Sequence, residues 1–237
     1  MTFSARVTER NNVQFTDNIG IQITKSELHA LVQFCGDGDR LEFISFRVGD
    51  GKMVAWATDG HNASYLHGDS WDGKGKPSKT LIECQLAADM AKTISKSMGK
   101  DHEVFLRTDK ALHLVEAEIK YIETSASCAK IDLTGHVADQ LDLSLPNYIP
   151  TRPPRGTGEV PFETQTFSFG ALALLKKVCA AAQTDVVRAF VNSNPTHPIY
   201  CEIDTPTRLH DEEQPRWICI LAPSTAAESD LSTKEGA

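Results

Sequence analysis

Apolar and polar residues alternate in short runs along much of the chain, a pattern typical of β-strands that bury one face. Between these runs, three segments repeat their apolar residues every three or four positions, which predicts amphipathic helices. The first helix is expected to begin after Thr24, because Thr24 and Glu27 have the spacing of a capping box, and to end near Gly36. The flanking pattern predicts strands over residues 19–23, 41–48, 52–58 and 62–66.

A second group repeats this order, with a strand over residues 80–84, a helix over 86–98, and strands over 103–108, 112–116 and 120–125. The apolar stripe of the helix consists of Leu86, Met90, Ile94 and Met98. At about 100° per residue, three lysines fall nearly opposite this stripe, on a face where we expect no acidic residue. They are Lys92, Lys96 and Lys100. A row of this kind fits either an ordinary solvated helix face or a surface that attracts a polyanion.

A third group follows a proline-rich region. Ser168 is the expected N-cap of a helix over residues 171–182, whose inward side chains are expected to be Leu172, Leu175, Val178 and Cys179. Its strands are predicted over residues 164–167, 186–192, 199–204 and 217–221. The remaining expectations are a short hairpin within residues 1–18, polar loops over 69–79 and 205–215, and irregular chain over 129–163.

The chain therefore has three β-α-β-β-β units, and repetition of one supersecondary unit is itself an argument about fold. We predict an α+β protein in which helices cover one face of antiparallel sheets. Residues 1–150 form a first domain of two units plus the N-terminal hairpin, 151–163 a linker, and 164–223 a partial domain of one unit. Residues 224–237 are polar and are expected to be disordered.

Composition narrows the class of protein without identifying it. The 237 residues are 41% hydrophobic and 24% charged, as in ordinary globular proteins, and carry a formal net charge of −8. No apolar run is long enough to span a membrane and no secretory leader is visible, so a cytoplasmic location is expected. The six cysteines lie within apolar runs and favour reduced core thiols over zinc ligands. We predict no metal, no cofactor and no enzymatic activity, since no catalytic motif stands in a suitable context.

The turn between the strands over 52–58 and 62–66 carries the first candidate chemistry. Asp59-Gly60 is a typical turn pair, because glycine accepts the positive φ that tight hairpins require. Asp59 and His61 fit an acid–base or metal pair, or a turn whose polar side chains bond the local backbone. We favour the second interpretation, since aspartate is common in turns for that reason.

Three short motifs nevertheless resemble one family, the bacterial DNA polymerase III beta sliding clamps. Ala57-Thr-Asp-Gly-His61 is similar to the family's V-A-T-D-G-H-R-L-A stretch, although Asn62-Ala63-Ser64 stands in place of Arg-Leu-Ala. Leu145-Pro-Asn-Tyr148 resembles F-P-D-Y, and Trp217–Pro223 resembles the terminal strand that ends in Met-Pro. The resemblance covers roughly residues 20–223 and implies the DNA-clamp fold, in which two units make a domain and the helices line a central hole.

The resemblance also implies a function: a homo-oligomeric ring that encircles duplex DNA and tethers a polymerase or other partners. Phosphate contacts that ignore sequence would let such a ring slide. The implied DNA-facing residues lie on or beside the three helices and are Lys25, Lys92, Lys96, Lys100, Lys176 and Lys177. The implied hydrophobic groove for partner peptides consists of Thr58, Gly60, His61, Pro146, Ile149, Leu221, Ala222 and Pro223.

Several alternatives stay open. The chain is half a domain short of a two-domain protomer, unless residues 130–163 contain a degenerate unit. A clamp-derived module that binds a replication or repair protein without encircling DNA is therefore the second hypothesis. Gln140–Leu145 (QLDLSL) is similar to the peptide that partners insert into clamps, but also alternates like a strand. We expect head-to-tail association to cover open sheet edges at the ends of the first and third units. The small size suggests a phage-encoded protein.

Overall fold

The computed structural model describes residues 20–38, 41–49, 51–71, 82–108, 114–134, 168–190, 198–204 and 215–223. The expected N-terminal hairpin, the strand over 164–167, the linker over 151–163 and the tail over 224–237 lie outside these residues, as does the QLDLSL segment. None of the described helices is long and apolar enough to cross a membrane.

The first unit contains β1 (Gly20–Thr24), α1 (Lys25–Val32), β2 (Phe43–Gly49), β3 (Lys52–Thr58) and β4 (Ala63–Trp71). The capping box is confirmed: Thr24 Oγ1 accepts from the Glu27 amide, and Glu27 Oε2 accepts from the Thr24 amide at 3.0 Å. The helix ends at Gln33, so the prediction of Gly36 as its cap was wrong. Gly36 instead packs against the β3–β4 turn, where an added Cβ would lie 2.9 Å from Asp59 Cα.

The second unit contains β5 (Ile82–Ala87), α2 (Ala88–Ser97), β6 (His102–Thr108), β7 (Leu114–Tyr121) and β8 (Ser127–Asp132). Two expectations were wrong here. Leu86 belongs to β5 and not to the helix stripe. The strands expected over 112–116 and 120–125 are the single strand β7, which continues through Glu118 because Arg107 and Lys120 neutralise that carboxylate.

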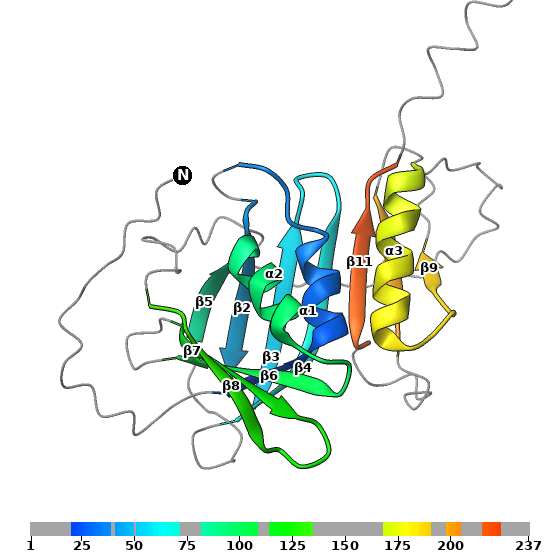
Figure 1. The fold of residues 1–237 in the computed structure, drawn as a ribbon. Coiled ribbons are helices and arrows are strands. Elements are labelled where there is room, and N and C mark those ends of the chain that lie inside the picture. The colour runs from blue at the N-terminus through cyan, green and yellow to red at the C-terminus, as the bar shows by residue number, and fades with distance from the viewer. Residues whose placement is uncertain are drawn as a thin grey trace, which may run out of the picture.

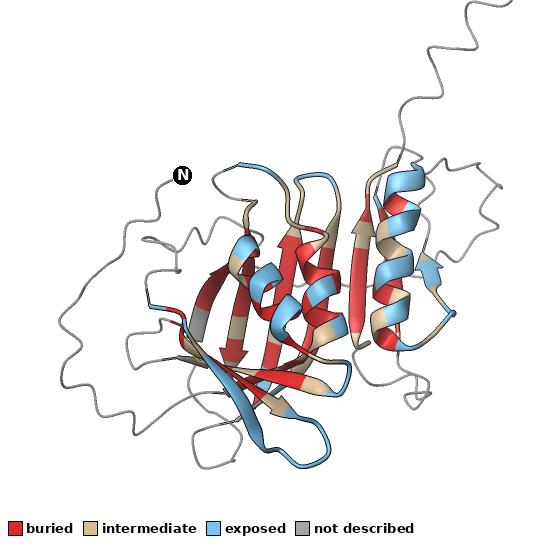
Figure 2. Cartoon of the chain, in the orientation of Figure 1, coloured by how far each residue is buried: buried red, intermediate tan, exposed pale blue. Residues whose placement is uncertain are grey.

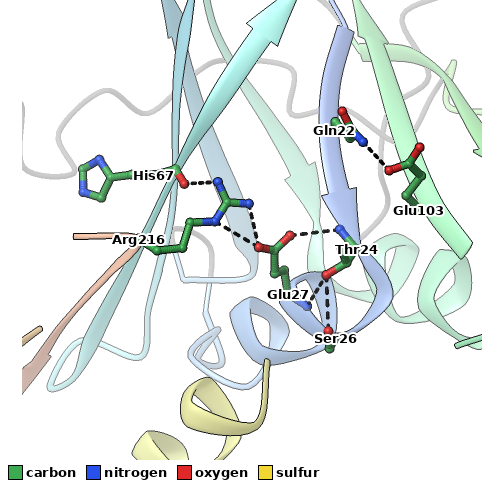
Figure 3. Close-up of polar contacts among 7 residues, drawn as sticks. All are labelled: Gln22, Thr24, Ser26, Glu27, His67, Glu103 and Arg216. Carbon is green, nitrogen blue, oxygen red and sulfur yellow. Dashed lines mark hydrogen bonds and ion pairs between the residues drawn. The ribbon is translucent and has the colours of Figure 1, made fainter. Parts of the chain in front are cut away.

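The two units exchange strands and are joined by them into one continuous sheet. β5 of the second unit pairs with β2 of the first, and β1 of the first pairs with β6 of the second, both antiparallel. The resulting strand orders, β5-β2-β3-β4 and β1-β6-β7-β8, are equivalent if the units are interchanged. The Gln22 side chain on β1 donates to Glu103 on β6 across this exchange (Figure 3). Figure 1 shows α1 and α2 side by side on one face of the strands.

The third unit contains α3 (Phe169–Ala182), β9 (Arg188–Phe190), β10 (Ile199–Ile203) and β11 (Trp217–Leu221). Ser168 is the N-cap, as predicted, and its Oγ accepts from the Ala171 amide at 3.0 Å. Of the four predicted inward residues of α3, Val178 is buried, whereas Leu172 is 44% exposed. Ala171 and Ala182 are buried beside Val178, because alanines let this helix lie close to its sheet.

β11 pairs with β4, so the third unit continues the sheet of the first. The register runs from Trp217 opposite Leu66 to Ile220 opposite Ala63. Our expectation that the ends of the first and third units are open edges was therefore wrong, because these two edges cover one another within the chain. Among the described strands, β8 pairs only with β7.

The main core lies between the three helices and the continuous sheet (Figure 2). Alternate residues of β3, β4, β10 and β11 form a second cluster on the opposite face of the sheet. It is built by Trp56, Tyr65, Tyr200 and Ile218, and it spans the junction between the first and third units. Burial on both faces explains why β3 and β11 have nearly continuous apolar sequences.

Candidate functional site

The lysine row of α2 is exposed on the side of the helix away from the sheet. Lys92, Lys96 and Lys100 are all exposed, whereas Ala91 and Ile94 are fully buried. The expectation that this face has no acidic residue was wrong: Asp89 Oδ1 lies 3.1 Å from Lys92 Nζ, an i,i+3 ion pair. Lys96 and Lys100 are therefore the better candidates for contact with an anion.

The other candidate lysines differ in how firmly they are held. Lys25 Nζ donates to the carbonyl of Met98 and so joins the start of α1 to the end of α2. Lys177 Nζ donates to Gln33 Oε1 and joins α3 to the end of α1. Lys176 is exposed. The lysines thus tie the three helices into one layer as well as charging its outer face.

This layer is basic although the whole chain is acidic. The three helices contain two acidic residues, Glu27 and Asp89, and Glu27 is buried. Six lysines lie on or directly beside the same helices, in a chain of net charge −8. The acidic side chains therefore lie mostly elsewhere, and such segregation favours binding of a polyanion by this one face.

The β3–β4 turn is held by its own polar side chains. Asp59 Oδ1 accepts from the amides of His61 and Asn62 at 2.8 and 2.6 Å, and Asp59 Oδ2 accepts from Asn62 Nδ2 at 3.0 Å. Partial burial raises the pKa of the Asp59 carboxyl, but these hydrogen bonds and the nearby His61 together hold it below its ordinary value. Gly60 has φ +89°, which explains the glycine. The turn interpretation of Asp59 is therefore confirmed, and its oxygens are committed to the local backbone.

The structure brings this turn next to the end of β11. Asn62 Oδ1 accepts from the Ala222 amide at 3.2 Å, one position beyond the β4–β11 ladder. Thr58, Gly60 and His61 thus share one end of the sheet with Ala222 and Pro223. Asn62 was not among our candidates, because it appeared only as a departure from the family motif.

The remaining groove candidates are either buried or outside the described residues. Leu221 is fully buried in the main core, so its side chain is not exposed as a groove wall. Pro146 and Ile149 lie outside the described residues. The described part of the site is therefore the turn from Thr58 to Asn62 together with Ala222 and Pro223, whose exposed members are Gly60 and His61.

Sequence reasoning also missed the residue that fixes the third unit in place. Arg216, just before β11, donates from Nε and Nη2 to Glu27 Oε1 at 3.1 and 2.6 Å, and from Nη1 to the His67 carbonyl (Figure 3). Its own carbonyl accepts from the His67 amide at 2.8 Å. Gly68 leaves room for the guanidinium, since a Cβ there would lie 3.0 Å from Nη1. The Glu27 carboxylate therefore both caps α1 and anchors Arg216.

Within the described parts of the chain, no group of three or more histidine, cysteine, aspartate or glutamate side chains is arranged to hold a metal ion. Cys128 is exposed, contrary to our expectation that all six cysteines are core thiols. The other five are buried or half-buried.

The fold is similar to that of solved bacterial sliding clamps. A DNA polymerase III subunit beta from Pseudomonas aeruginosa is 13% identical with a TM-score of 0.52, over 86% of this chain and 66% of that one. A DnaN sliding clamp from Bartonella birtlesii, bound to griselimycin, is 9% identical with a TM-score of 0.56, over 91% of this chain and 67% of that one. A putative DNA polymerase III beta subunit from Eubacterium rectale is 12% identical with a TM-score of 0.52.

These likenesses show the fold alone. No family model matches the sequence, and no curated protein has significant sequence similarity to it. The chain spans about two thirds of the length of the clamps it matches, 65% of the Eubacterium rectale protein. The predicted α+β architecture of the DNA clamp is confirmed: the chain has a clamp-like fold.

Proposed function

We propose that the protein is a sliding-clamp-like processivity factor that encircles duplex DNA in a homo-oligomeric ring and tethers a polymerase or another partner. The observation that carries the proposal is the basic outer face of the α1–α3 layer on an acidic chain. A clamp must attract phosphates without reading sequence, and exposed lysines on rigid helices do this. The acidic remainder of the surface would repel DNA and so confine it to that face.

The partner site is proposed at the end of the sheet where the β3–β4 turn meets Ala222 and Pro223. The hydrogen bond between Asn62 and Ala222 fixes the relative position of two segments that are 160 residues apart in sequence. A peptide of the Q-L-D-L-F type is the expected ligand, from the family resemblance. Pro146 and Ile149 would complete the site.

Salt-dependent binding to a short duplex tests the basic face. Each phosphate contact that is lost should lower the magnitude of the salt slope by roughly 0.9, so Lys96→Ala/Lys100→Ala should lower it by about 1.8. The matched control is Lys52→Ala/Lys130→Ala, which removes two charges from the strands at side chains that are 75% and 54% exposed. The proposal predicts an unchanged slope for the control. Equal slopes in all three proteins would contradict it.

Topological linkage tests encirclement separately. After incubation with nicked circular DNA, the bound protein should survive gel filtration in high salt and be released when the circle is cut. The alternative function is an interaction module that binds a partner without encircling DNA. It predicts peptide binding at the β3–β4 turn with no linked protein on circles.

A further inference from the structure

One exposed carboxylate interrupts the basic face of the three described helices. Asp89, in the first turn of α2, has a side chain that is 87% exposed, and its Oδ1 lies 3.1 Å from Lys92 Nζ. The other acidic residue of these helices, Glu27, is buried and paired with Arg216. Asp89 is therefore the helical acid that an anion approaching this face would meet.

An acidic residue at the start of a helix commonly serves the helix itself, through the helix dipole. The side chains of Thr24 and Ser168 cap α1 and α3, whereas the N-cap of α2 is Ala87, which has no side-chain cap hydrogen bond. Asp89 offsets part of that lack. Its carboxylate nevertheless hydrogen-bonds Lys92, one turn further along, so its charge also acts on the lysine row. A test must separate these two effects.

The start of α2 lies in acidic surroundings. The Ala88 amide donates to the Glu42 carbonyl at 2.8 Å, which places Glu42 beside the first turn of the helix. The Glu42 carboxylate accepts from the Gly38 amide at 3.3 Å, and Asp37, the residue before Gly38, is exposed. Two further carboxylates therefore lie near the first turn of α2.

The end of α2 is basic by contrast. Lys96 and Lys100 are exposed there, and Lys25 bonds to the end of α2 from the start of α1. These lysines outnumber Asp101 and Glu123, which a backbone hydrogen bond between the α2–β6 and β7–β8 turns brings to the same end. The surface of α2 therefore changes from acidic at its start to basic at its end.

The rise of the helix limits how far the charge of Asp89 acts. At 1.5 Å per residue, Lys92 stands about 4.5 Å and Lys96 about 10.5 Å from Asp89 along the helix axis. The second separation exceeds the Debye length of about 8 Å at physiological ionic strength. Asp89 therefore cancels the charge of Lys92 and leaves that of Lys96 largely unaffected.

We propose that Asp89 weakens and positions DNA binding, because it cancels the charge of Lys92 and confines the phosphate contacts of α2 to the end of that helix. This inference rests on the proposed clamp function. A sliding protein must release each phosphate easily, so a carboxylate within the lysine row suits sliding better than an uninterrupted row.

The same charge separates the duplex from the proposed partner site. α1 and α2 run in opposite directions, because Lys25 at the start of α1 bonds to the end of α2. The end of α1 therefore lies near the start of α2. Gly36, which follows α1, packs on Asp59 of the β3–β4 turn. The acidic start of α2 thus stands between the basic end of that helix and the partner site.

A double-mutant cycle, measured as salt-dependent binding of a short duplex to the full chain, tests this role. Asp89→Asn should leave Lys92 able to contact a phosphate, which raises the magnitude of the salt slope by roughly 0.9 and tightens binding about eightfold at roughly 0.1 M salt. Lys92→Ala should lower the slope by about 0.9 in the Asp89→Asn protein and by much less in the wild type. Loss of the helix-dipole contribution can only weaken α2, so tighter binding by Asp89→Asn cannot arise from helix stability.

The control is Asp69→Asn, which removes the acid of a comparably close pair on the strands, Lys52–Asp69 at 2.9 Å, and should leave affinity and slope unchanged. Equal affinities of the wild type and Asp89→Asn, or an equal effect of Lys92→Ala in both, would overturn this inference while duplex binding still supports the proposed function. Absence of duplex binding by the wild type and by Asp89→Asn would overturn both.

Discussion

Replacing Glu27 with glutamine removes the charge of the ion pair that fixes the third unit, and one of its two acceptor oxygens. The Thr24 amide donates to Glu27 Oε2 and Arg216 donates to Oε1, so the single amide oxygen of glutamine can accept from Arg216 or from Thr24 but not from both. If that oxygen faces Arg216, the acceptor for Arg216 becomes neutral and the capping bond to the Thr24 amide is lost. The side chains of Arg216 and Glu27 are only 19% and 9% exposed, so water cannot readily replace the lost charge.

The magnitude follows from two hydrogen bonds, those from Arg216 Nε and Nη2 to Glu27 Oε1. A bond to a charged group is worth about 1.5–3 kcal/mol and a neutral one about 0.5–1.5, so each bond should lose about 1 kcal/mol. Glu27→Gln should therefore lower the free energy of unfolding by about 2 kcal/mol through the bonds to Arg216, and by about 1 kcal/mol more through the lost capping bond. Arg216→Met should lower it by about 2–4 kcal/mol, because it also leaves the Glu27 carboxylate unpaired.

Urea denaturation followed by tryptophan fluorescence is the assay, since Trp217 is adjacent to Arg216 and fully buried. The double variant should be less destabilised than the sum of the single variants, by about 1.5 kcal/mol. The exposed Lys52–Asp69 pair, at 2.9 Å, is the control, and Asp69→Asn should change stability by less than about 1 kcal/mol. Strict additivity, or single variants as stable as this control, would refute the argument that the pair joins the two units.

Three further predictions concern the turn and the thiols. His61→Glu should weaken binding of a Q-L-D-L-F-type peptide about tenfold, or ~1.4 kcal/mol, by calorimetry; it is preferable to substituting Gly60, whose positive φ would be strained. The pKa of the Asp59 carboxyl is lower in the folded state than in the unfolded state, so the ionised carboxylate stabilises the fold above the unfolded pKa. That stabilisation should be lost as the pH falls below about 4 and through the folded pKa. Hydrogen exchange of the Asn62 amide should then accelerate, and Asp59→Asn should abolish this dependence of exchange on pH. Burial raises the pKa of the Cys84 thiol to about 12, so a thiol reagent at pH 8 should label exposed Cys128 first and Cys84 only after unfolding; equal rates would contradict the described core.

The local sequence predicted those helices and strands whose bounds are marked by residues within or next to the element. The bounds of β3 and β11 agree with prediction because both strands are nearly continuous apolar runs that end at glycine, proline or polar residues. The start of α1 was predicted because a capping box acts within four residues. The prediction divided β7 into strands over 112–116 and 120–125, whereas the strand continues through Glu118, whose charge is balanced by Arg107 from the neighbouring strand. The sequence around Glu118 does not indicate that Arg107 pairs with it.

The candidate site depends on contacts between distant parts of the sequence, and these were less predictable. The motif at Thr58–His61 indicated the place of a candidate site, but not the hydrogen bond between Asn62 and Ala222. The exchange of β1 and β5 between units and the pairing of β4 with β11 place residues together that no local period relates. Arg216, which stands in a polar stretch before β11, had no apolar or turn signature that could mark it as the partner of Glu27.

The β4–β11 pairing connects the contacts of Arg216 with those of Ala222. Its four paired positions end on one side at Arg216, held by Glu27 and the His67 carbonyl, and on the other at Ala222, held by Asn62. The ladder is thus fastened at both ends to the first unit. Because α3 packs on β10 and β11, this attachment also sets the position of α3 against α1, and with it the continuity of the basic helix face. The proposed partner site and the proposed DNA-facing layer therefore depend on the same strand pairing.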